Sequence, residues 1–171
     1  MKGRKLTALP KYILTQIERI VSGIEKGKLA HIQYDYGTRI SCGTAHCIAG
    51  WHDTFKYMKA TQIKDPTNVK TNEMEDFFQL NNDLPEVIKE SHHILWAIAA
   101  KDWQLTVIEQ NLLFGGARTL NNIRGTLEQL KKGLRATGHL NTVSVNWIDP
   151  AKNPTNYRFD QMSTWVDYEV V

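Results

Sequence analysis

The first clear helical pattern of this chain lies in the stretch Pro10-Lys-Tyr-Ile-Leu-Thr-Gln-Ile-Glu-Arg-Ile-Val-Ser-Gly-Ile-Glu-Lys-Gly27. Its isoleucines and one valine stand at positions 13, 17, 20, 21 and 24, so they recur every three or four residues. This spacing places them on one face of a helix over residues 10–26. Pro10 suits the first turn of such a helix, and Gly27 suits its end. The stretch therefore predicts an amphipathic helix with one buried face.

Similar patterns continue along most of the chain. They predict further helices over residues 44–58, 73–80, 83–99, 102–114 and 120–134. Thr44, Asp83 and Asp102 are residue types that cap helix N-termini, and we expect each to open a helix. Gly138 is expected to close the last helix. The predicted fold is mainly α, with four to six helices around one core.

The last thirty residues have a different pattern. Apolar residues alternate over 142–147, turn residues follow at 149–154, and residues 164–171 are rich in β-forming types. Alternation with turn signals predicts a small C-terminal β-hairpin or strand pair. We therefore expect a helical part over residues 1–138 and a β-rich extension over 139–171 packed on it, as a single domain overall.

Length and composition indicate a globular protein. The chain has 171 residues, of which 42% are hydrophobic and 23% charged, and its net charge is +3. It has no apolar run of about 18 residues, the length that spans a bilayer. Residues 1–12 also lack the apolar core of a signal peptide. We expect a cytoplasmic protein without membrane association, in which cysteines stay reduced.

The segment Cys42-Gly-Thr-Ala-His-Cys47 is the best candidate for chemistry. If Thr44 caps the next helix, Cys47 lies in the first turn, where the helix dipole favours a thiolate and lowers its pKa. Cys47 and the adjacent His46 are therefore the candidate catalytic residues. The direct alternative is a close helix entry, because buried thiols and small residues allow tight packing.

A metal site is a second hypothesis for the same segment. Its candidate ligands are Cys42, Cys47, His52 and His92. The two cysteines are separated by four residues, unlike the two-residue spacing typical of zinc sites, so we favour a structural role. No cofactor is expected.

The motif Cys-Gly-Thr-x-x-Cys-x-Ala-Gly-Trp, here Cys42 to Trp51, resembles a signature of small bacterial and phage proteins of uncharacterised function. In those proteins the motif opens a helix, and a later Leu-Phe pair, matched here by Leu113-Phe114, precedes another helix. The resemblance covers about a quarter of the chain. It implies a shared fold and a bacterial or phage origin, but no established activity and no catalytic residues.

Two surfaces are candidates for partner binding. Basic residues gather near the last predicted helix, at Arg118, Arg124, Lys131, Lys132 and Arg135. Glu128 interrupts them and no nucleic-acid-binding motif accompanies them, so a nucleic-acid partner is not favoured. Aromatic residues gather in the C-terminal region, at Trp147, Tyr157, Phe159, Trp165 and Tyr168. They either cover the helical core or, where exposed, form a partner surface. Such residues dominate binding hot spots, so this region favours a protein partner or a homo-oligomer.

The sequence thus favours a non-enzymatic interaction or accessory protein. The alternative is a thiol- or metal-dependent enzyme centred on Cys42 and Cys47, with His46, His52 or His92 as base or ligand.

Overall fold

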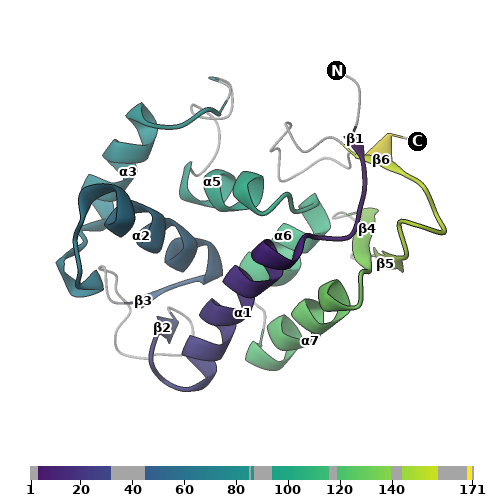
Figure 1. Cartoon of the computed structure of the whole chain (residues 1–171), viewed down its shortest axis with the longest axis horizontal. Helices are drawn as coiled ribbons and strands as arrows, with labels where there is room; N and C mark the ends of the chain where they lie inside the picture. The colour runs from purple at the N-terminus through teal and green to yellow at the C-terminus, as the bar shows by residue number, and fades with distance from the viewer. Residues whose placement is uncertain are drawn as a thin grey trace. The chain divides into compact units, whose positions relative to one another are not determined.

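The computed structural model describes residues 4–31, 45–84, 86, 94–115, 119–139, 144–157 and 169–170 (Figure 1). Its helices are α1 (Lys11–Glu25), α2 (Ile48–Thr61), the 3-10 helix η1 (Pro66–Asn68), α3 (Thr71–Leu80), α5 (Ile94–Asp102), α6 (Val107–Phe114) and α7 (Leu120–Lys131). Its strands are β1 (Arg4–Lys5), β2 (Ala30–His31), β3 (Ala45–His46), β4 (Arg135–His139), β5 (Ser144–Ile148), β6 (Asn156–Tyr157) and β7 (Glu169–Val170). The predicted mainly helical fold with a small C-terminal strand pair is confirmed.

The chain divides into two compact units. One unit comprises residues Glu18–Ala99, and the other combines Met1–Ile17 with Ala100–Val171. The divisions fall within α1 and α5, whereas the predicted boundary after residue 138 falls within β4. We call the two parts the central unit and the terminal unit.

Helix α1 has the buried face that its sequence predicts. The five apolar residues at helical spacing are all less than 9% exposed: Ile13, Ile17, Ile20, Val21 and Ile24. The helix ends at Glu25, two residues before Gly27, whose φ of 73° lies in the left-handed region that favours glycine. Periodicity and stop signal agree here, so the predicted limits of residues 10–26 are confirmed to within one residue.

Helix α2 begins later than predicted. Ala45 and His46 form β3, which pairs in parallel with β2, so the backbone is still extended there. The N-cap is Cys47, whose sulfur accepts a hydrogen bond from the Gly50 N–H at 3.4 Å. The prediction of Thr44 as the cap was wrong, because the extended pair moves the N-cap three residues along the chain, to Cys47.

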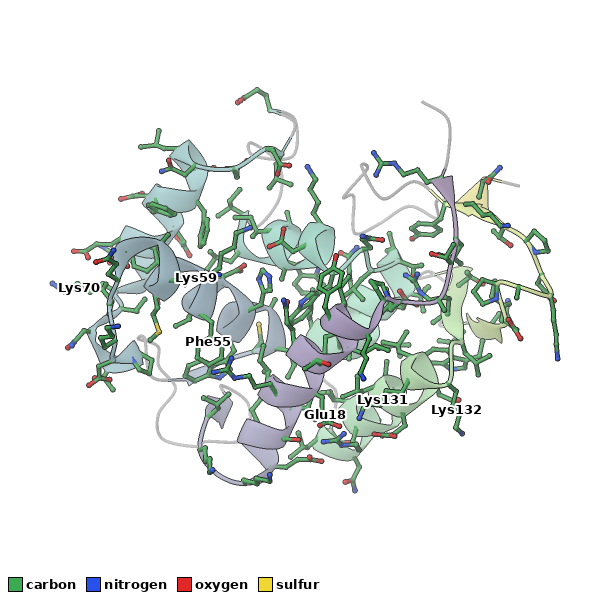
Figure 2. The ribbon with its side chains drawn as sticks, in the orientation of Figure 1. Glu18, Phe55, Lys59, Lys70, Lys131 and Lys132 are labelled. Carbon is green, nitrogen blue, oxygen red and sulfur yellow. The ribbon has the colours of Figure 1, made fainter. Side chains whose placement is uncertain are left out.

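In the central unit, α2 and α3 share an aromatic cluster. The ring centroid of Tyr57 lies 5.2 Å from that of Phe77 and 6.3 Å from that of Phe78, and both ring pairs are edge-on. Arg19 lies 5.5 Å from the ring centroid of Phe55, which is labelled in Figure 2.

The predicted short helix over 73–80 is confirmed as α3. Most of the predicted helix over 83–99 lies outside the described residues, and the described part is helical from Ile94.

Helix α6 also begins at a different residue. Asp102 was predicted to cap it, but α5 continues to Asp102 and α6 begins after Thr106. Thr106 Oγ1 accepts the Glu109 N–H at 3.1 Å, and Glu109 Oε1 accepts the Thr106 N–H at 2.9 Å. This reciprocal capping box satisfies two donors that a helix start leaves open. It outweighs the single cap that Asp102 offers.

Helix α7 is shorter than predicted. It begins after the N-cap Thr119 and ends at Lys131, and Gly133 then has a φ of 86°. Only glycine adopts this left-handed backbone readily, so Gly133 ends the helix and turns the chain. The expected end at Gly138 was therefore wrong, and that residue belongs to β4.

In the terminal unit, β4 and β5 form an antiparallel pair in which Ala136 lies opposite Trp147. Helix α6 contacts both β4 and α7. A second small sheet has the order β1-β6-β7. Every described helix is too short or too polar to cross a lipid bilayer.

Candidate functional site

The structure describes only part of the predicted cysteine site. Cys42 and His92 lie outside the described residues. The backbone of His46 is placed in β3, but its side chain lies outside the description. The side chains of Cys47 and His52 are described, and both belong to the start of α2 in the central unit.

Cys47 is a partly buried thiol. Burial raises the pKa of this thiol, the negative charge of Asp53 raises it further, and the hydrogen bond from Gly50 opposes both effects. The sequence predicted a lowered pKa from the helix dipole. The direction is reversed because loss of hydration penalises a thiolate more than the helix terminus stabilises it. The neutral thiol therefore predominates at pH 7.

His52 and Asp53 form a buried pair near this thiol. His52 Nδ1 lies 2.8 Å from Asp53 Oδ1, and neither side chain is more than 8% exposed. Among the residues with described side chains, no three histidine, cysteine, aspartate or glutamate residues converge as metal ligands. The pair is an arrangement that fixes the histidine ring.

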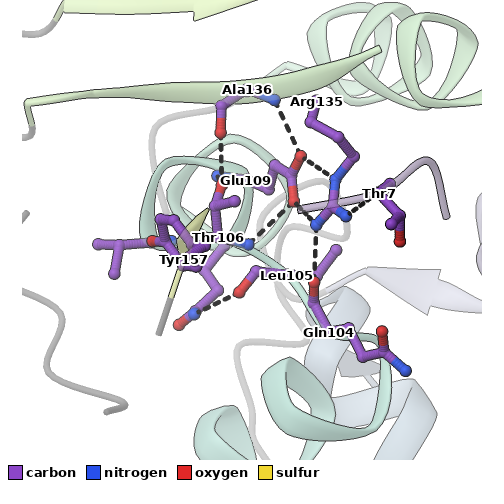
Figure 3. A network of polar contacts seen from close by, with 10 residues as sticks. Thr7, Gln104, Leu105, Thr106, Glu109, Arg135, Ala136 and Tyr157 are labelled. Carbon is purple, nitrogen blue, oxygen red and sulfur yellow. Dashed lines mark hydrogen bonds and ion pairs between the residues drawn. The ribbon is translucent and has the colours of Figure 1, made fainter. Parts of the chain in front are cut away.

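A larger polar network lies in the terminal unit, and sequence reasoning did not find it. Glu109 accepts two hydrogen bonds from Arg135, from Nε at 2.9 Å and from a terminal nitrogen at 2.7 Å (Figure 3). Arg135 had been assigned to the basic face of the last helix, but it is 1% exposed and starts β4. The Thr106-x-x-Glu109 pattern was the available signal, since it is typical of a capping box.

The remaining contacts of the network join four segments. The other donors of Arg135 reach the backbone oxygens of Thr7 at 2.6 Å and Gln104 at 2.7 Å. Ala136 donates its N–H to Glu109 at 2.9 Å and accepts from the Thr106 hydroxyl at 2.6 Å (Figure 3). Each oxygen of Glu109 accepts two hydrogen bonds, so the network is satisfied and has a structural role.

This network positions one wall of a groove on the terminal unit. Because Ala136 is held on α6 and lies opposite Trp147, the network anchors the strand pair to which β5 belongs. The groove has a volume of about 400 Å³ and is lined by residues from α6, α7 and β5: Leu112, Asn121, Asn122, Gly125, Thr126, Gln129, Val145 and Trp147. We call it the α7–β5 groove.

The lining of the α7–β5 groove is neutral but rich in hydrogen-bonding groups. None of the residues that line it is ionisable. Within the described parts of the chain, the side-chain amides of Asn121, Asn122 and Gln129 make no hydrogen bond. Trp147 is half-buried and provides an aromatic wall. The groove therefore offers donors, acceptors and apolar surface without charge.

The predicted aromatic surface is divided by the structure. Tyr157 is 3% exposed, and its hydroxyl accepts the Val107 N–H at 2.5 Å, so it belongs to the core. Trp147 lines the groove. Phe159, Trp165 and Tyr168 lie outside the described residues.

The predicted basic face is also smaller than expected. Arg135 is buried, and Arg118 lies outside the described residues. Arg124 and Lys131 each contact Glu128, at 3.0 and 3.5 Å. Lys131 and Lys132 lie at the C-terminal end of α7 (Figure 2). Positive charges are stabilising there, because this end of the helix dipole is partly negative.

No protein-family model, curated protein or solved structure matches this chain.

Proposed function

We propose that this chain is a non-enzymatic interaction or accessory protein that binds a protein partner through the α7–β5 groove. The observation that supports this most is the composition of the groove. It combines the Trp147 ring with three side-chain amides that have no partner among the described residues. Concave sites that combine apolar surface with convergent polar groups are typical of binding sites.

The groove is equipped for binding rather than for chemistry. It has no described acid, base or thiol in its lining, and its one hydroxyl, on Thr126, donates to the Asn122 backbone oxygen at 3.0 Å. A catalytic site needs a nucleophile or a proton-transfer group within reach of the substrate. Recognition of a partner needs only shape, apolar area and matched hydrogen bonds.

The Glu109–Arg135 network supports the same proposal. It ties β4 to α6 through buried contacts, and β4 in turn holds β5 at the edge of the groove. A preformed wall costs less conformational entropy when a partner binds. We further propose a cytoplasmic protein of bacterial or phage origin, because of the motif from Cys42 to Trp51.

The alternative is a thiol- or metal-dependent enzyme centred on Cys42 and Cys47. A thiol enzyme requires a thiolate, and burial raises the pKa of Cys47, which disfavours that form at neutral pH. Self-association through the C-terminal aromatic region is a narrower form of the favoured proposal, in which the partner is a second copy.

Site-specific photocrosslinking tests the proposal. A photoreactive phenylalanine would replace Asn122 in the groove or, as the control, exposed Lys152 in the same unit, and the chain would be expressed in bacterial cells. We expect one discrete protein adduct from position 122, absent from position 152, and reduced at least fivefold when Gly125→Leu fills the groove. Equal labelling at both positions, or no adduct at position 122, would contradict the proposal. An adduct of twice the chain mass would identify the partner as a second copy.

A further inference from the structure

We infer that the ligand of the α7–β5 groove is an uncharged, extended polypeptide segment, which lies along the outer edge of β5 and passes over Gly125. This inference rests on the proposed function, because it names the chemistry of the partner that the groove would hold.

The lining selects against charge. None of the groove-lining residues is ionisable, so a charged group of a ligand would find no opposite charge among them, whereas a neutral one needs none. Each amide of Asn121, Asn122 and Gln129 has both a donor and an acceptor. A peptide group has the same two functions, so it matches these side chains without leaving either one unsatisfied.

The dimensions of the groove suit an extended chain. Asn122 and Gln129 are seven residues apart on α7, about 10 Å along the helix axis. About three residues of extended chain span that distance. The two amides therefore lie at the ends of a short strand-length path, with Gly125 between them.

The opposite wall provides a strand edge. β5 pairs with β4 on one side, and among the described strands none pairs with its other edge. Val145 and Trp147 are two positions apart, so both face the groove from the same side of β5. An unpaired edge beside side-chain pockets is the arrangement that proteins use to add a peptide strand.

Gly125 is the independent observation that points to a ligand. It lies inside α7, where glycine destabilises a helix by about 1 kcal/mol relative to alanine. A Cβ placed at this position would meet no atom of the described residues within 4 Å, and its backbone needs no left-handed φ. Packing within the described part of the chain therefore does not require a glycine here. A glycine does let another backbone approach the helix closely.

A peptide library displayed on phage tests the inference against the intact chain. Peptides of twelve residues would be selected on the immobilised protein, synthesised, and measured by titration calorimetry. We expect uncharged central residues and at least a tenfold loss of affinity with Gly125→Leu. The control is Lys132→Leu, which adds the same side chain to an exposed position outside the groove. Both changes suit a helix, so each variant is expected to fold.

N-methylation of the selected peptide tests the strand geometry. Along an extended strand, alternate N–H groups face the neighbouring strand. Two methylated peptides would be compared, one modified at the odd-numbered nitrogens and one at the even-numbered nitrogens. Binding should be abolished in one of them and should stay within threefold of the parent peptide in the other. Loss of binding in both methylated peptides, or in neither, would overturn strand addition. Selected peptides that ignore Gly125→Leu, or an empty selection, would overturn the inference as well.

The photocrosslinking result keeps the two proposals separate. A groove adduct together with a failed peptide selection would retain the protein partner but exclude a linear peptide ligand. Binding of maltoheptaose or chitohexaose that is lost in Gly125→Leu would instead assign the groove to neutral sugars and overturn the inference.

Discussion

Glu109 accepts two hydrogen bonds from Arg135 at 2.9 and 2.7 Å, across 26 residues of sequence, inside a core where neither side chain is more than 1% exposed. The pair joins the first turn of α6 to the first residue of β4. Both charges are satisfied by further hydrogen bonds to the backbone, so they are matched at nearly every polar atom. Through β4 the pair also sets the position of β5 and of Trp147.

Glu109→Gln should destabilise the protein strongly. The change leaves the Arg135 charge buried without its counter-ion, which costs about 3–5 kcal/mol. The matched control is Glu128→Gln, which removes an ion pair with Arg124 that is 24% and 50% exposed and should cost about 0.5 kcal/mol or less. Urea unfolding followed by circular dichroism gives both values. Equal losses of unfolding free energy in the two variants would show that the buried pair does not hold α6 and β4 together.

Thr106→Ala should destabilise α6 by about 1–2 kcal/mol. The change removes the N-cap acceptor for Glu109 and the donor to the Ala136 oxygen, both of which are buried. Thr106→Ser keeps the hydroxyl that makes both hydrogen bonds. The loss of these hydrogen bonds should therefore contribute less than about 0.5 kcal/mol to its change in unfolding free energy, and the remaining change comes from the lost methyl group. Thermal unfolding of the three proteins tests the prediction, which fails if serine is as destabilising as alanine.

Gly125→Ala and Gly133→Ala should have opposite effects on stability. Alanine at position 125 lies within a helix and meets no atom of the described residues within 4 Å, so it should stabilise the protein by about 0.5–1 kcal/mol. At position 133 the φ of 86° is left-handed, so alanine should cost about 1–2 kcal/mol. The midpoints of urea unfolding would reveal both shifts. A destabilising Gly125→Ala would show that helix packing does require that glycine.

Cys47 should react slowly and make stability depend on alkaline pH. Its pKa is raised in the folded state, so folding favours the protonated thiol and the stabilisation is complete below the ordinary pKa of about 8.5. The contribution is lost as the pH rises from there through the folded pKa. Urea unfolding at pH 7 to 10.5 should show this decline, and Cys47→Ser, which keeps a capping residue, should reduce it.

Alkylation provides the second measurement for Cys47. In a Cys42→Ser background, iodoacetamide labelling at pH 7 should be at least tenfold slower in the folded protein than in urea. Equal rates would indicate an accessible, ionised thiol and would favour the thiol-enzyme alternative.

The sequence predicted the helices whose signals are local. Helix α1 is defined by its apolar spacing and by Gly27, which act within a few residues, so its limits were correct. The helix starts at Thr44 and Asp102 were wrong because residues distant in sequence compete with local caps. A parallel pairing with β2 keeps Ala45 and His46 extended. Likewise, the capping box of Thr106 places the start of α6 four residues beyond Asp102.

The candidate site could be predicted only in fragments. Cys47 was found by its residue type, but the direction of its pKa shift depends on burial, which is a property of the folded chain. The sequence identified Trp147 as one of several aromatic residues. It did not show that Tyr157 belongs to the core instead, because that depends on the contact of the Tyr157 hydroxyl with Val107. Asn122, Gly125 and Gln129 are ordinary helix-surface residues in the sequence. They form a site only when β5 lies beside them.

By itself, the sequence determined the mainly helical class, the limits of α1, the C-terminal limit of α3, and the small C-terminal strand pair, because the signals for these features act between near neighbours. Only the tertiary structure decided that Arg135 is a buried partner of Glu109 rather than a surface cation. The reason is that a guanidinium is stable in a core only where long-range contacts supply a carboxylate and backbone oxygens together. The same contacts, through Ala136, created the α7–β5 groove.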